Sequence, residues 1–285
     1  MGRDCTQRER ALDVFYYSVV FVFGLIFGSF ANVVIWRLPR GESLSVPASH
    51  CPLCETPITW YDNIPVLSWL LLLGRCRSCG APISVRYPAV ELLSGLLWLA
   101  SAVRFGLSAR AAVAAFFFYM LLLLAFIDAD TMRLPNSLVG ALGIVGLVCV
   151  SVAQISHLAA APLYVGASGL LAEPGVYAIV GSVASAGFVL VVAAAYSRVR
   201  GRQGFGMGDV KLLGVMGLFL GVYTLVVLLL GSVGGAVFGL VQSRRSPEGI
   251  AHKFPFGPFL AAAAVIVALW GDRIVSGYLT LIGIS

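Results

Sequence analysis

Residues 111–128 read AAVAAFFFYMLLLLAFID, an unbroken apolar run that ends on an aspartate. A bilayer span needs roughly 20 apolar residues, with a range of about 17–25, so this run is long enough to cross a membrane. A carboxylate at the end of such a run is costly to keep and is a functional hypothesis by default. The stretch therefore predicts a transmembrane helix and a candidate catalytic residue, Asp128.

The whole chain shares this apolar character. Hydrophobic residues make up 59% of the sequence and charged residues 11%, and the mean hydropathy is +0.95. Soluble domains carry about 25% charged residues, so a soluble fold is excluded. We expect an all-α, polytopic membrane helix bundle of about eight transmembrane helices, the sixth of them short. The expected spans are 14–36, 88–103, 111–127, 137–155, 176–197, 211–222, 223–241 and 256–271.

The basic residues indicate the orientation of these spans. If the loop after the first span is cytoplasmic, most of the 19 Lys and Arg residues lie in cytoplasmic loops, as the positive-inside rule requires. Segment 156–175 holds no Lys or Arg and fits an outside loop. The net charge of +6 thus reflects topology rather than a nucleic-acid partner. Anionic lipid headgroups of the bilayer are the expected partner of the basic surface.

One loop differs from the others in composition. Residues 37–87 are polar and contain prolines and cysteines, which predicts a small extramembrane domain. We therefore divide the chain into an N-terminal tail and first helix (1–36), a cytoplasmic zinc-binding domain (37–87) and a membrane core with the catalytic residues (88–285). The sequence shows no low-complexity segment and no clear internal repeat.

Four cysteines in this loop have the spacing of a metal site. The pairs read C-x2-C…C-x2-C with 21 residues between them, and the residues are Cys51, Cys54, Cys76 and Cys79. Four thiolates close the tetrahedral shell of Zn²⁺, which predicts a structural rather than a catalytic metal. Two disulfides or free thiols are the alternative, although a reducing cytoplasm argues against disulfides. A loop of this size holds little core, so a metal would stabilise it.

A second aspartate completes a possible catalytic pair. Asp209 ends the stretch GMGD at 206–209, just before another apolar run. In the expected topology Asp128 and Asp209 both fall at cytoplasmic helix ends and can face each other. Two carboxyl groups that share a site hold one proton between them, so one can accept a proton from water while the other donates to the oxyanion. Buried ion pairs or a cation pathway are the alternatives.

Other charged residues compete for these roles. Asp130 competes with Asp128, because residues two apart on a helix point about 200° from each other and only one can face Asp209. Arg133 and Lys211 could pair with the spare carboxylate. Glu91 in the second span is better explained as the anchor of a helix contact or the partner of a basic loop residue.

Two motifs surround the aspartates, FIDADTMRLPN at 126–136 and GMGDVKL at 206–212. They resemble the two active-site motifs of the bacterial type IV prepilin peptidases, and the second holds the GxGD signature of intramembrane aspartyl proteases. Further matching segments run in order along the chain. They include GSFANVV at 28–34, HCPLC at 50–54, NIP at 63–65, GRC at 74–76 and FGPFL at 256–260.

This resemblance implies a function and a site. It implies that Asp128 and Asp209 are catalytic, that Asp130 is not, and that the cysteine loop binds zinc. It implies leader cleavage of prepilins or pseudopilins of type IV pili or type II secretion, followed by N-methylation with S-adenosylmethionine. The implied location is the bacterial inner membrane, with the active site at the cytoplasmic face. A peptidase-only enzyme and a membrane scaffold or channel with a structural zinc loop are the alternatives.

Overall fold

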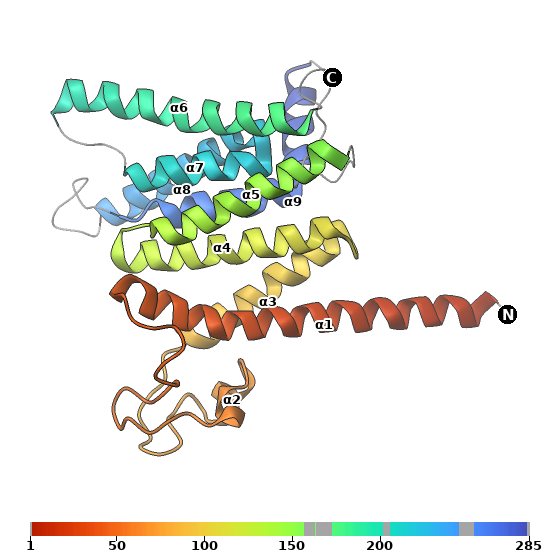
Figure 1. The fold of residues 1–285 in the computed structure, drawn as a ribbon, viewed down its shortest axis with the longest axis vertical. Coiled ribbons are helices and arrows are strands. Elements are labelled where there is room, and N and C mark those ends of the chain that lie inside the picture. The colour runs from red at the N-terminus through yellow and green to blue at the C-terminus, as the bar shows by residue number, and fades with distance from the viewer. Residues whose placement is uncertain (1, 157–162, 164–172, 202–205, 245–253, 284–285) are drawn as a thin grey trace. The chain divides into compact units, whose positions relative to one another are not determined.

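The computed structural model describes residues 2–156, 163, 173–201, 206–244 and 254–283. Within these ranges the chain forms helices and two isolated β-bridges but no strand, which confirms the predicted all-α class (Figure 1). The long helices are α1 (Gly2–Arg37), α3 (Arg86–Phe105), α4 (Ala109–Thr131), α5 (Asn136–Ser156), α6 (Pro174–Arg200), α7 (Met207–Leu220), α8 (Thr224–Ser243) and α9 (Gly257–Leu281).

The membrane spans agree with the expected ranges to within a few residues, except that the last one, expected to end at 271, continues to Leu281. Seven apolar segments of the described chain are long enough to cross a membrane. One of them, Met207–Ser243, consists of α7 and α8, which the 3-10 turn η4 (Gly221–Tyr223) joins, so the predicted sixth and seventh spans fall within it. The apolar tail continues α9 as far as Leu281. Most of the predicted outside loop at 156–175 lies outside the described residues.

The chain forms two compact units, Met1–Tyr119 and Met120–Ser285. The division into 1–36, 37–87 and 88–285 stays a prediction. In the first unit α1 packs closely on α3. A Cβ atom on Gly24 would lie 2.8 Å from the Cα of Gly95, and one on Gly28 would lie 2.6 Å from the Cα of Glu91. Lipid tails do not drive apolar helices together, so small residues that allow close backbone approach hold such a pair.

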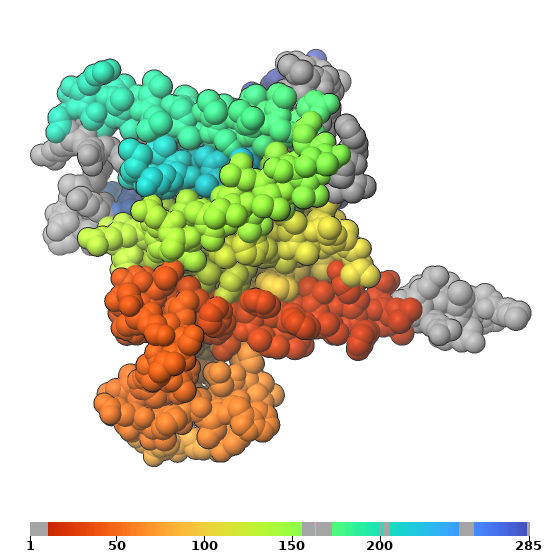
Figure 2. All heavy atoms as spheres, in the orientation of Figure 1, coloured from red at the N-terminus to blue at the C-terminus, as the bar shows by residue number. Residues whose placement is uncertain are grey.

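The second unit is built around α7. In the space-filling view α7 lies between α6 and α5 (Figure 2). A Cβ atom on Gly217 of α7 would lie 2.4 Å from the backbone of Ser182 in α6, so glycine is required at this crossing. Leu124 and Ile127 of α4 and Leu212 of α7 are fully buried. The short helix is therefore held in the core of the unit, and its first turn carries Asp209.

The loop between α1 and α3 contains two copies of one turn. In the first turn, the Cys51 amide donates to the Thr56 carbonyl and the Glu55 amide to the Cys51 carbonyl. In the second turn, the Cys76 amide donates to the Ala81 carbonyl and the Gly80 amide to the Cys76 carbonyl. His50–Pro57 and Arg75–Pro82 bridges close the turns. The stretches CPLCETPI at 51–58 and CRSCGAPI at 76–83 carry this repeat. The expectation of no internal repeat was wrong, because the pattern spans only eight residues.

Candidate catalytic and metal sites

Asp128 lies in the last turn of α4 and is buried, with 6% of its surface exposed. Its Oδ2 accepts a hydrogen bond of 2.9 Å from the backbone amide of Gly257, the first residue of α9. The first amides of a helix have no partner within the helix, so this one is available for the carboxylate. Pro258 follows and fits the first turn, where its missing N–H costs nothing.

Gly257 is required beside this carboxylate. A Cβ atom at position 257 would lie 2.7 Å from Oδ2 of Asp128 and 3.1 Å from its Cγ. Glycine therefore lets the α9 backbone approach the carboxylate. In the sequence, Gly257 stood out only as part of FGPFL at 256–260, one of the stretches that carry the family resemblance, and no role was predicted for it.

Asp209 is the third residue of α7 and is partly buried. A Cβ atom on Gly206, the residue before the helix, would lie 3.1 Å from Oδ2 of Asp209. A Cβ atom on Gly208 would lie 3.2 Å from Leu134, in the segment that follows α4. The two glycines of GxGD thus serve different contacts, one with the carboxylate and one with the loop after Asp128.

The two carboxyl groups lie on the same side of the unit. Asp128 at the end of α4 accepts the Gly257 amide, and Gly208, next to Asp209, lies against Leu134 in the segment that follows α4. The charge of Asp128 acts on Asp209. Asp209 lies in the first turn of its own helix, and Asp128 accepts an amide from the first turn of α9. The positive ends of two helix dipoles therefore face the pair, which offsets part of the cost of holding negative charge there. The arrangement suits two carboxyls that share one proton.

The competing residues lie elsewhere. Asp130 is exposed, whereas Asp128 is buried. Lys211 donates a 3.0 Å hydrogen bond to Oδ1 of Asn136 and thereby links α7 to α5. Glu91 is buried, and its Oε2 accepts a 2.7 Å hydrogen bond from the Val66 amide. This partner is a backbone amide of the loop domain, whereas the sequence suggested a helix contact or a basic loop residue.

The four loop cysteines come together. All four sulfurs lie within 4.8 Å of one another, and those of Cys51 and Cys79 are 3.8 Å apart. Four sulfurs placed about 2.3 Å from one Zn²⁺ ion in a tetrahedron are about 3.8 Å from each other. The described cysteines form no disulfide. The cluster therefore fits a tetrahedral metal ion.

Two polar groups prepare the cluster and its surroundings. The side chain and backbone amide of Thr56 lower the pKa of Cys54 to about 6, which favours its thiolate. In Cys79 the hydrogen bond from the Ala81 backbone lowers the pKa, but hydrogen bonds with the other three cysteines and desolvation outweigh it and raise the pKa to about 11. Beside the cluster, the Arg77 guanidinium contacts Asp62 at 2.6 Å. Its hydrogen bonds lower the pKa of Asp62. This pair ties the second cysteine turn to η2 (Trp60–Asn63).

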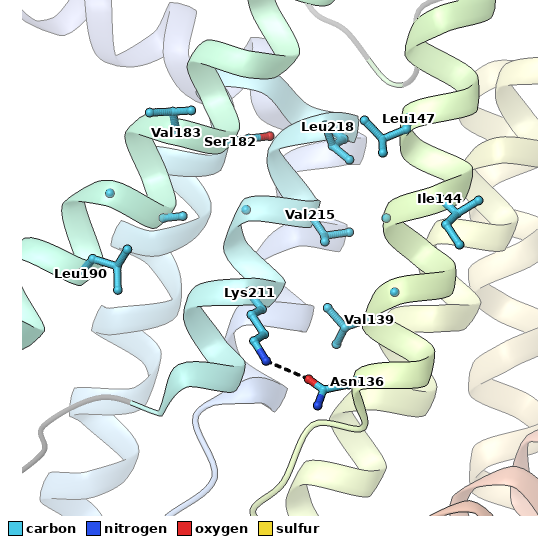
Figure 3. A pocket seen from close by; sticks show the side chains of 15 residues that line it. Asn136, Val139, Ile144, Leu147, Ser182, Val183, Leu190, Lys211, Val215 and Leu218 are labelled. Carbon is cyan, nitrogen blue, oxygen red and sulfur yellow. Dashed lines mark hydrogen bonds between the residues drawn. The ribbon is translucent and has the colours of Figure 1, made fainter.

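An apolar groove of about 720 Å³ lies between α5, α6 and α7 (Figure 3). Leu147, Leu190 and Leu218 line it, and the Lys211–Asn136 hydrogen bond lies at one end. Asp209 and Lys211 are two residues apart on α7 and point about 200° from each other. The groove and the Asp209 carboxylate therefore lie on different faces of α7.

The fold and these sites define a polytopic helical membrane protein with a carboxyl pair at two helix ends and a four-cysteine cluster in a loop. Residues 22–105 match the bacterial peptidase A24 N-terminal domain, and residues 115–240 match the type IV leader peptidase family. The chain is 38% identical to the prepilin leader peptidase/N-methyltransferase of Aeromonas hydrophila, over 96% of this chain and 97% of the relative.

A second relative with the same description, from Stutzerimonas stutzeri, is 38% identical over 90% of this chain and 92% of its own length. No solved structure matches the chain. The chain belongs to the type IV leader peptidase family, which confirms the resemblance seen in the sequence.

Proposed function

We propose that this chain is a prepilin peptidase that cleaves the leader of prepilins or pseudopilins and then N-methylates the new terminus. Family membership and the names of its relatives, prepilin leader peptidase/N-methyltransferases, support this activity. The observation that carries the proposed site is the carboxyl pair Asp128 and Asp209, brought together from two helix ends. The alternative of a scaffold or channel is tested by the cleavage assay below, since neither would cleave a purified prepilin.

The proposed chemistry is general acid–base hydrolysis. The two carboxyls share one proton. The ionised one accepts a proton from a water as that water attacks the scissile carbonyl, and the protonated one donates to the carbonyl oxygen as it becomes tetrahedral. The carboxyl group that took a proton from the water then gives it to the leaving amine, and the other carboxylate takes a proton from a hydroxyl of the tetrahedral intermediate, which restores the pair. No covalent enzyme intermediate forms. The Gly257 amide holds Asp128 in place for this exchange.

The cysteine cluster is proposed to hold structural zinc through Cys51, Cys54, Cys76 and Cys79. With four thiolates the shell is closed, so the ion supplies stability rather than a site for substrate. S-adenosylmethionine is the methyl donor that the relatives' name suggests, and we assign no residue to it.

We also propose that cleavage takes place at the cytoplasmic face of the inner membrane. The distribution of Lys and Arg supports this orientation. A basic leader will not be attracted by a basic surface, so binding must come from the apolar helix of the substrate against helices of this protein. A cysteine placed at Ala129 should react with a polar thiol reagent from the cytoplasmic side; reaction only from outside would refute the orientation.

The catalytic proposal is tested with isosteric variants. Asp128→Asn and Asp209→Asn should each lower cleavage of a purified prepilin by about 10²–10⁴-fold, because acid–base groups contribute that much. Both variants should still insert in the membrane. Asp130→Asn is the matched control, since this carboxylate is exposed, and it should keep substantial activity. Loss of cleavage in Asp130→Asn but not in Asp128→Asn would reverse the assignment.

A further inference from the structure

The loop domain carries an apolar surface that neither proposed site uses. Residues 64–73 read IPVLSWLLLL and contain no charged residue. Part of this segment forms the short helix α2 (Leu67–Leu71). Its leucines point away from the loop domain, and the exposed ones are Leu67, Leu70, Leu71 and Leu73. Contiguous exposed leucines of this kind mark a contact with a partner or a membrane.

The polar groups of the same segment are turned inward. Ser68 is buried, and its hydroxyl donates a 2.9 Å hydrogen bond to the carbonyl of Tyr61. The indole N–H of Trp69 donates a 3.0 Å hydrogen bond to the carbonyl of Ile83. A helix that faces water shows the opposite arrangement, with apolar residues inside and polar ones outside. The segment therefore has the polarity expected next to hydrocarbon, where polar groups must be satisfied internally.

The segment also lies beside a helix that is long and apolar enough to span a membrane. The amide of Val66, directly before α2, donates a 2.7 Å hydrogen bond to Oε2 of Glu91. Glu91 is five residues into the membrane span that begins at Arg86, which places it about 7 Å along the helix from that end. The start of α2 thus lies beside α3 rather than beyond its end (Figure 1). Interfacial helices bury their apolar face about 5–10 Å into a membrane.

The residues at the ends of the segment suit a lipid interface. Trp60 and Tyr61 precede the segment, and both are exposed. Trp and Tyr are the side chains enriched at membrane–water interfaces. Arg75 follows it and is exposed, where it can meet lipid phosphates. The charge of the nearby Asp62 is neutralised by Arg77 at 2.6 Å.

We propose that residues 64–73 insert into the membrane leaflet on the Arg86 side, with the leucines among the acyl chains and Trp60 and Tyr61 at headgroup level. The occupant of this surface is lipid, because the hydrogen bond to Glu91 places the segment beside a transmembrane helix. The inserted segment holds the cysteine cluster close to the membrane surface. This inference requires only the membrane span α3 and holds whether or not the chain cleaves prepilins.

A photo-cross-linking residue tests the proposal in the full chain, reconstituted in nanodiscs of phosphatidylcholine and phosphatidylglycerol. A diazirine-bearing leucine analogue is placed at Leu71 or at Leu53, which lies in the first cysteine turn. Both side chains are 74% exposed, so they form a matched pair that differs only in location. We expect lipid adducts at position 71 to exceed those at position 53 by at least tenfold by mass spectrometry.

Other outcomes overturn the proposal. Equal lipid adducts at the two positions, or adducts of position 71 mainly with a second copy of the chain or with an added prepilin, would show that lipid is not the occupant. If the analogue at position 71 disrupts folding, the same comparison is made with position 67, which also faces outward. Absence of lipid adducts at position 67 in folded protein would again refute insertion.

Discussion

The Gly257→Ala substitution tests whether the α9 backbone positions the catalytic carboxyl. The new methyl group would lie 2.7 Å from Oδ2 of Asp128 and 3.1 Å from its Cγ. Ordinary contacts begin near 3.4 Å, so the carboxyl group must move by roughly 0.5–1 Å or rotate. A displacement of about 1 Å at a reacting group can cost about 10²-fold in rate. We therefore expect cleavage to fall by about 10–100-fold, which corresponds to about 1.4–2.7 kcal/mol in activation free energy.

The substitution should act on activity rather than on folding. Gly→Ala at a position with ordinary dihedrals reduces the entropy of the unfolded chain and stabilises by about 0.4–1 kcal/mol. That gain offsets part of the local strain, so the variant should insert and purify normally. Gly277→Ala is the matched control, because it lies in the same helix and a Cβ there meets nothing within 4 Å.

The assay measures the kcat and KM of both variants on a purified prepilin. We expect Gly257→Ala to lose kcat with little change in KM, because the displaced group takes part in the chemistry and not in substrate binding. Gly277→Ala should match the wild type. If Gly257→Ala cleaves at the wild-type rate, the Gly257–Asp128 contact does not position a catalytic group, and the reasoning from the geometry fails.

Two further predictions concern the loop domain. Purified protein should carry about one zinc per chain, and Cys54→Ser should lower the metal content in reducing buffer. Peptide cleavage should remain in this variant, because a closed four-thiolate shell makes the metal structural. Metal analysis that finds no zinc in the wild type would refute the site. Hydrogen bonds from Arg77 lower the pKa of Asp62 in the folded protein. The stabilisation from this pair is therefore fully present above about pH 3.9, the pKa of an unperturbed Asp, and is lost as the pH falls through the lower pKa of the folded state. A double-mutant cycle of Asp62→Asn and Arg77→Gln, read by thermal unfolding, should give constant coupling from pH 8 to pH 5; coupling that declines within this range would contradict the assignment.

Much of the molecule could be predicted because its signals are local. A run such as 111–127 is long and apolar enough to identify a span without any knowledge of its neighbours. The cysteine spacing predicted a cluster that the structure brings together, since two short turns each present two sulfurs. The helix ends at Asp128 and Asp209 followed from where the apolar runs stop.

Other features escaped because composition does not report what a side chain touches. Residues 64–73 were included in a polar loop, yet Leu71 is exposed and Ser68 is buried. Hydropathy measures the cost of leaving water and cannot distinguish a leucine that faces lipid from one that faces protein. The role of Glu91 was left between two alternatives, since its partner, the Val66 amide, is a backbone group of a distant loop.

The sequence by itself determined the membrane class of this protein, its spans, its four metal-ligand candidates and the two aspartates, because each depends on the residues within one short stretch. The tertiary structure alone decided which groups meet. Asp128 and Gly257 are far apart in the chain, and their hydrogen bond exists only because the fold brings the end of α4 to the start of α9. Helix periodicity alone puts Asp209 and Lys211 on different faces of α7. Only packing decides what each face meets, which is the second carboxyl group on one side and the groove against α5 and α6 on the other.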